Sequence, residues 1–277
     1  MLTRRHIRVK VMQSIYALIQ SKDDSLQKQE KFLKVSIENT YTLYLLWLSL
    51  FVEIQKRAAD QISLSANKYI SDKKQEFPNP NKFIQNKLLL QIVDNTMLAE
   101  EINHRKLDNW YLNEEYVKLI YKEIIESEAY QEYMSKSESD YASDKELVLT
   151  LFKTIFAPNE KIYDYFEDDK LTWVDDIPIV NTFVLKHLKK AKQVHPESYF
   201  LPSLMKDDDD MQYALQLLSR TLLKNEALEK EIEGKTPNWD KDRIAEIDSI
   251  LLKMAICELL HFPSIPERVT INEYLEI

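Results

Sequence analysis

Glycine is almost absent from this chain, because Gly234 is the only one among 277 residues. β-Hairpins and phosphate-binding loops use glycine, since they need positive φ angles or a close approach of the backbone that a Cβ atom would obstruct. One glycine cannot meet those needs over this length, so the sequence predicts an all-α fold. The same scarcity excludes a P-loop, a Rossmann fingerprint and a nucleophile elbow, each of which needs more than one glycine.

The apolar content and the cysteine count indicate the kind of compartment. Hydrophobic residues make up 44% of the chain, which is typical of a globular protein. The N-terminus lacks the apolar core of a signal peptide, and the most apolar window, residues 44–54, is too short to cross a bilayer. The single cysteine, Cys257, cannot form an intramolecular disulfide. We therefore expect a soluble protein of the reducing cytoplasm, with no membrane partner.

Apolar residues recur at helical spacing from the start of the chain. Thr3 is a suitable N-cap for an opening helix whose apolar stripe contains Ile7, Val11 and Ile15. Two prolines within residues 76–83 predict a loop. The other predicted helices cover roughly residues 38–68, 84–104, 113–136, 144–156, 159–168, 176–193, 210–224, 225–233, 241–261 and 270 onward.

Two late segments carry more specific expectations. Residues 247–260 are apolar on nearly every side, which predicts a helix that is buried all round at the centre of a bundle. The acidic run at residues 206–210 predicts a solvated turn, whose charges favour the N-terminus of the helix after it.

An internal repeat links two of the predicted helical stretches. The shared landmarks are Asn159-Glu160 with Asn225-Glu226, and Trp173 with Trp239. The offset is constant, since 225 − 159 and 239 − 173 both equal 66. Two copies are too few for a solenoid, so the repeat predicts a duplicated helical unit inside one domain.

Catalytic and metal-binding patterns are weak. None of the five histidines lies three or four residues from another, so a helical pair of metal ligands is absent. Glu101 and His104 match half of a di-iron motif, but such a site needs a second copy, and an exposed polar face is the alternative. Cys257 lies in an apolar helix, where a buried, inert thiol is expected. We predict no catalytic residue, no metal and no cofactor.

The chain begins with a basic cluster, although its formal net charge is −9. The cluster consists of Arg4, Arg5, His6, Arg8 and Lys10, with no acid between them. Positive side chains in a first helical turn oppose the macrodipole at a cost of about 0.3–1 kcal/mol each, and like charges repel. An anionic partner such as a nucleic-acid phosphate would relieve both costs. An ordinary solvated surface is the alternative, and composition leaves the two open.

Both ends of the chain resemble one family. Residues 4–16, RRHIRVKVMQSIY, resemble the opening helix of the NusB transcription antitermination factors, with an arginine-rich start followed by Gln13 and the aromatic Tyr16. Residues 238–277 resemble the C-terminal core of that family. The matching positions are Asn238-Trp239, Asp242-Arg243-Ile244, Asp248, Leu251, Glu258-Leu259, Ile265-Pro266, Val269 and Ile271-Asn272-Glu273.

The resemblance implies a domain organisation. We expect residues 1–277 to form a single all-helical domain, whose NusB-like core of two packed three-helix bundles comes from residues 1–20 and 206–277. Residues 21–205 would then be a helical insertion, built partly by the duplication. The last helix of the family continues beyond the position of Ile277, so that helix is expected to be truncated here.

The resemblance also implies a role without catalysis. NusB factors pair with ribosomal protein S10 (NusE) and bind the boxA sequence of single-stranded RNA. They act with the transcription elongation complex and support ribosomal RNA synthesis. Arg4, Arg5 and Arg8 carry over as RNA contacts, His6 and Lys10 are local additions of suitable chemistry, and Arg268 lies where the family often has a basic residue.

Two other functions compete with this one. The first is a helical protein-interaction scaffold that keeps the fold without binding RNA. The second is an accessory domain of an RNA methyltransferase, because NusB-like domains are fused to some of those enzymes. One glycine and no methyl-donor loop exclude the enzyme itself.

Overall fold

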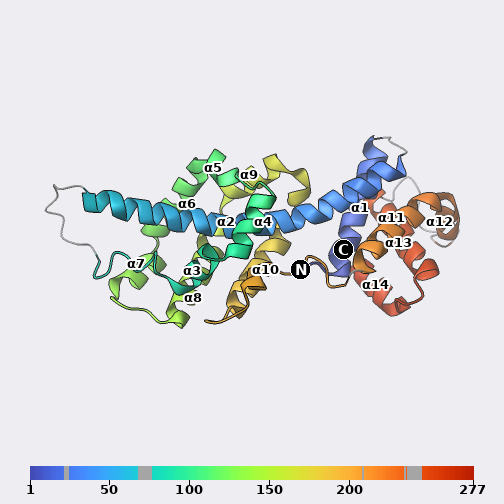
Figure 1. The fold of residues 1–277 in the computed structure, drawn as a ribbon. Helices are drawn as coiled ribbons and strands as arrows, with labels where there is room; N and C mark the ends of the chain where they lie inside the picture. The colour runs from blue at the N-terminus through green and yellow to red at the C-terminus, as the bar shows by residue number, and fades with distance from the viewer. Residues whose placement is uncertain (22–24, 68–76, 208, 234, 236–244) are drawn as a thin grey trace. The chain divides into compact units, whose positions relative to one another are not determined.

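Helices make up the regular structure of this protein (Figure 1). The computed structural model describes residues 1–21, 25–67, 77–207, 209–233, 235 and 245–277, and these contain no strand. The predicted all-α fold is therefore confirmed. The described helices are α1 (Arg4–Ser21), α2 (Leu26–Asn67), α3 (Lys87–Val93), α4 (Thr96–His104), α5 (Asn109–Leu112), α6 (Glu114–Glu126), α7 (Glu128–Ser135), α8 (Tyr141–Leu151), α9 (Glu160–Asp169), α10 (Asp176–Lys190), α11 (Asp209–Leu223), α12 (Asn225–Ile232), α13 (Glu246–His261) and α14 (Glu267–Leu275).

The chain forms two compact units. Met1–Asn39 and Ser203–Ile277 make up the first, here called the terminal unit, and Thr40–Pro202 make up the second, the central unit. Helix α2 begins in one unit and continues into the other. No helix in the part of the chain that the structure describes is long and apolar enough to span a membrane.

Several predicted helix boundaries are wrong, and polar side chains explain the differences. The stretch 84–104 divides into α3 and α4 because Asn95 caps the second helix, accepting a hydrogen bond from the Leu98 amide at 2.7 Å. The stretch 113–136 divides into α6 and α7 because Ser127 caps α7. Helix α2 begins at Leu26 rather than near residue 38. The prediction placed its start too late because charged residues in the first turns interrupt the apolar stripe.

An aromatic cluster fills the core of the central unit. Trp47 of α2 is 1% exposed, and its ring meets Phe152 and Phe166 edge to face at centroid distances of 5.4 and 5.2 Å. Trp173 is also fully buried and lies against Phe166 at 5.6 Å. Tyr44 donates a hydrogen bond from its hydroxyl to the Phe200 carbonyl at 3.0 Å. This cluster fixes the middle of α2 in the central unit.

The two copies of the repeat have matching burial but lie in different units. Equivalent pairs that are buried in both copies are Asp144 and Asp210, Val148 and Ala214, and Ile162 and Leu228. The first copy belongs to the central unit and the second to the terminal unit, and a duplication inside one domain stays a prediction. Trp239, a landmark of the second copy, lies outside the described residues.

The terminal unit is organised around α13. Helix α1 packs on α11 and α13, and Ile7, Val11 and Ile15 are buried there as predicted. The expectation that α13 is buried all round is wrong, because Leu260 is 58% exposed. Helices α1, α11, α12 and α14 contact α13, and its side chains are buried on one face, at Ile250, Met254, Cys257 and Glu258.

Candidate nucleic-acid interface

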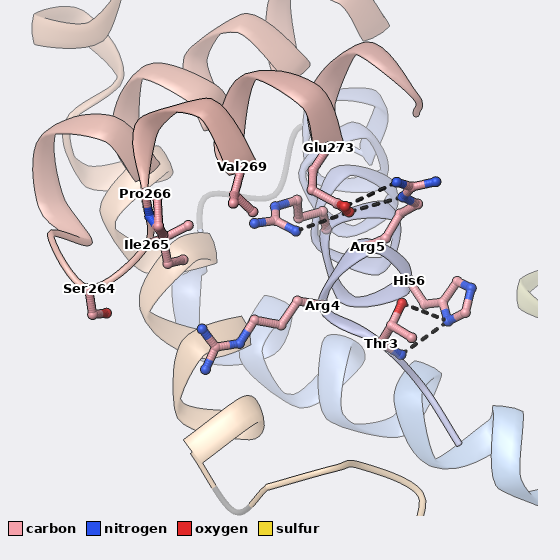
Figure 2. A pocket seen from close by; sticks show the side chains of 10 residues that line it. Thr3, Arg4, Arg5, His6, Ser264, Ile265, Pro266, Val269 and Glu273 are labelled. Atoms are coloured by element: carbon pink, nitrogen blue, oxygen red, sulfur yellow. Dashed lines mark hydrogen bonds and ion pairs between the residues drawn. The ribbon is translucent and has the colours of Figure 1, made fainter.

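A pocket lies at the start of α1, in the terminal unit (Figure 2). Its volume is about 560 Å³. We call it the α1 pocket. It is lined by Thr3, Arg4, Arg5, His6 and Arg8 from the start of the chain, by Ser264, Ile265 and Pro266 from a turn, and by Val269 and Glu273 from α14. Cationic side chains therefore face a short apolar wall across the pocket.

Local interactions fix the beginning of α1. The Thr3 carbonyl accepts the Ile7 amide at 3.1 Å, and the Thr3 amide donates to Nδ1 of His6 at 3.1 Å. The second bond occupies one imidazole nitrogen. Burial lowers the pKa of His6, and the neighbouring positive charge of Arg5 lowers it further. His6 is therefore largely neutral at pH 7.

Arg4 is paired within the unit. Its Nε donates to Oδ1 of Asp210 at 2.9 Å, and its guanidinium lies 5.0 Å from the centre of the Tyr213 ring. Asp210 is 3% exposed, so the expectation of a wholly solvated acidic run at residues 206–210 is wrong at this position. Asp208, within that run, lies outside the described residues. The ion pair leaves the Arg4 side chain 41% exposed at the pocket.

Arg5 is held by two carboxylates of the last helical segment. Its Nε and Nη2 donate to the two oxygens of Glu273 at 2.9 and 3.0 Å, and its Nη1 donates to Glu276 at 2.8 Å. The hydrogen bonds from Arg5 lower the pKa of Glu273. The Arg5 side chain remains 38% exposed.

Arg8 differs from both, because it is 1% exposed. Its Nε and Nη2 donate to the two oxygens of Glu258, which is 0% exposed, at 2.9 and 2.6 Å. Glu258 also accepts hydrogen bonds from the hydroxyls of Tyr213 at 2.5 Å and Thr270 at 2.7 Å. Burial alone would raise the pKa of Glu258, but these bonds outweigh it and lower the pKa overall.

The carboxylates that neutralise the basic cluster are distant in sequence. Asp210, Glu258, Glu273 and Glu276 come from the other end of the chain, so local composition gives no sign of the pairing. One available signal is Glu258, a lone acid in a run of apolar residues. A buried carboxylate requires a partner, and the arginines supply the missing charge.

The predicted RNA-binding residues therefore divide into two sets. Arg4, Arg5 and His6 line the α1 pocket, and Arg268 is exposed on α14 outside the lining set. Arg8, which also lines the α1 pocket, and Lys10 are only 1% and 2% exposed, so both are shielded from solvent. RNA contact at these positions stays a prediction.

The weaker motifs have structural roles. Glu101, from the half di-iron motif, accepts a hydrogen bond from Nε of Arg105 at 2.5 Å along the same helix. The described residues contain no group of three or more His, Cys, Asp or Glu side chains that would hold a metal ion. Cys257 is a buried free thiol whose pKa is raised by burial, as expected for an inert cysteine.

Fold and site together define an all-helical protein with an arginine-lined pocket at a helix N-terminus. The family model for NusB matches residues 184–277, so the C-terminal part of the chain is similar to the NusB family. Residues 1–20 lie outside the matched range, and their resemblance stays a prediction. Asn238, Trp239 and residues 242–244, which contribute to the resemblance, lie outside the described residues.

Relatives named transcription antitermination protein NusB match part of the chain. The one from Geotalea daltonii is 38% identical over 76 residues, which are 27% of this chain and 52% of the relative. The one from Natranaerobius thermophilus is 38% identical over 69 residues, which are 25% of this chain and 50% of the relative. The chain thus spans about half the length of these relatives. No solved structure shows a significant match to the chain.

Proposed function

We propose that this protein is a non-catalytic, RNA-binding transcription antitermination factor similar to NusB. In this proposal it pairs with ribosomal protein S10 (NusE), binds boxA-like single-stranded RNA in the cytoplasm, and supports ribosomal RNA synthesis within the transcription elongation complex. The match of residues 184–277 to the NusB family supports the general role. The observation that carries the RNA site is the pair of half-exposed arginines at the pocket.

The chemistry of the α1 pocket suits a nucleotide. A helix N-terminus attracts phosphate through its unpaired amides and its dipole, and α1 is 18 residues long. Arginine adds charge-assisted hydrogen bonds to phosphate oxygens. Opposite the arginines, Ile265, Pro266 and Val269 offer an apolar wall for the face of an unstacked base. Arg8 has a positioning role in this proposal, because its ion pair ties α1 to α13.

The test is RNA affinity after the exposed arginines are neutralised. Arg4→Gln/Arg5→Gln is expected to weaken binding of a boxA-like oligonucleotide about 10-fold or more at low salt, because two phosphate contacts are lost. The log–log salt slope should fall in magnitude by roughly 1.4, at about 0.7 per single-strand contact. Fluorescence anisotropy over a salt series measures both. Glutamine keeps a donor toward Asp210 and Glu273, so the variant should remain folded.

The matched control is Lys31→Gln/Lys230→Gln, which removes the same charge from exposed positions of the same unit. It should change affinity less than about 3-fold, because neither lysine lines the α1 pocket and exposed charges are screened by salt. Equal affinities for both variants would show that the arginines are not the RNA site. S10 should tighten RNA binding by the wild type. A folded protein that binds S10 but no RNA would favour the scaffold instead.

A further inference from the structure

We propose that Glu276 competes with RNA phosphate for Arg5 and so limits RNA affinity from within the terminal unit. The pair of carboxylates that hold Arg5, Glu273 and Glu276, is here called the carboxylate latch. This inference rests on the proposed function, because it concerns the same arginine and the same ligand.

The latch occupies every nitrogen of the Arg5 guanidinium. Nε and Nη2 donate to Glu273, and Nη1 donates to Glu276 at 2.8 Å. A phosphodiester recognises arginine through the same donors, with which carboxylate and phosphate form similar charge-assisted hydrogen bonds. These bonds take three of the five guanidinium N–H groups of Arg5, so RNA phosphate competes with the two carboxylates for this side chain.

Glu276 is the member of the latch that can be displaced. Its side chain is 63% exposed and accepts a single hydrogen bond from Arg5. Glu273 is 24% exposed, makes two bonds to Arg5 and approaches Nη1 of Arg8 at 3.6 Å. Exposed ion pairs are weak, so a strand with several phosphates can replace Glu276. Glu273 would then keep Arg5 oriented toward the pocket.

This arrangement favours polyanions over single anions. One phosphate that replaces Glu276 gains little, because it exchanges one anionic partner for another and meets the nearby negative charge. A strand gains additional contacts, at Arg4 and along the apolar wall of the pocket. The latch thus raises the number of simultaneous contacts that a ligand needs.

The test compares Glu276→Gln with the wild type in binding the boxA-like oligonucleotide at low salt. The variant should bind about 3- to 10-fold more tightly, because the competitor and a repulsive charge are both removed. The difference should shrink at about 0.5 M salt, where exposed charges are screened. Glu267→Gln is the matched control, since it removes the same charge from an exposed position of the same helix, about 13 Å away along the axis.

The affinities of the wild type and the two variants distinguish the carboxylate latch from the proposed RNA-binding function. Glu267→Gln should change affinity less than about 2-fold. If it tightens binding as much as Glu276→Gln does, net charge explains the gain and the latch is overturned. Wild-type binding with an unchanged or weakened Glu276→Gln variant would overturn the latch and leave the proposed function intact. Absence of RNA binding by all three folded proteins would reject the proposed function, and the latch with it.

Discussion

Glu258→Ala is expected to lower the free energy of unfolding of the terminal unit by about 3–5 kcal/mol. The substitution leaves Arg8 as a buried charge without its carboxylate and removes the acceptor of the Tyr213 and Thr270 hydroxyls. Glu273, which lies 3.6 Å from Nη1 of Arg8, compensates only part of that charge, and a poorly compensated buried charge is far less stable than one exposed to water. Urea denaturation followed by far-UV circular dichroism measures the loss.

An apolar pair provides the control for this prediction. Arg8→Met/Glu258→Leu removes both charges from the same buried site, so it should recover most of the stability that Glu258→Ala loses. A single variant as stable as the wild type would show that the ion pair does not hold α1 on α13. A double variant as unstable as the single one would show that the lost acceptor of the Tyr213 and Thr270 hydroxyls, rather than the unpaired charge of Arg8, explains the loss.

Lowering the pH should weaken the interactions of Glu258 with Arg8, Tyr213 and Thr270. The pKa of Glu258 is lowered in the folded state, so its contribution to stability is present above its unfolded pKa of about 4.3. That contribution is lost as the pH falls through the lowered folded pKa, because protonation removes the partner of Arg8. The difference in stability between wild type and Glu258→Ala should therefore narrow below about pH 4.

Sequence periodicity predicts which face of a helix is buried, but not which helix covers it. The stripe of α1, Ile7, Val11 and Ile15, could be read directly because apolar residues at that spacing can only face a core. The pairing of Arg8 with Glu258 could not be predicted from the sequence, because a separation of 250 residues leaves no local signal. The same limit explains α13, whose uniformly apolar sequence gives no sign that Leu260 is exposed.

The sequence also could not predict which arginines of the basic cluster are exposed. Composition left open whether the basic cluster meets an anionic partner or is an ordinary solvated surface, and residue type alone made Arg8 equivalent to Arg4 and Arg5. The fold separates them, because α11, α13 and α14 bring carboxylates to each arginine at different depths. Depth decides which guanidinium can reach a ligand. Only tertiary structure determines depth, so the resemblance could indicate the cluster but not which of its arginines are exposed.

Trp47→Ala is expected to destabilise the central unit by about 3–5 kcal/mol. The indole is 1% exposed and packs edge to face on Phe152 and Phe166, so alanine leaves a cavity that these rings cannot fill without moving. The remaining tryptophans of the unit, Trp110 and Trp173, report the shifted transition by fluorescence in urea. RNA affinity at low urea should not change, because the arginines of the α1 pocket belong to the terminal unit.

Trp47→Phe separates the packing from the polar atom of the indole. Nε1 of Trp47 is buried and has no hydrogen-bond partner among the described residues, so phenylalanine removes an unsatisfied donor while it keeps an aromatic ring. We expect it to cost less than about 2 kcal/mol, clearly less than alanine. Equal losses for the two variants would mean that a smaller aromatic ring does not restore the packing, so that the core depends on the full indole. Reduced RNA affinity in either folded variant would show that the central unit contributes to the RNA site.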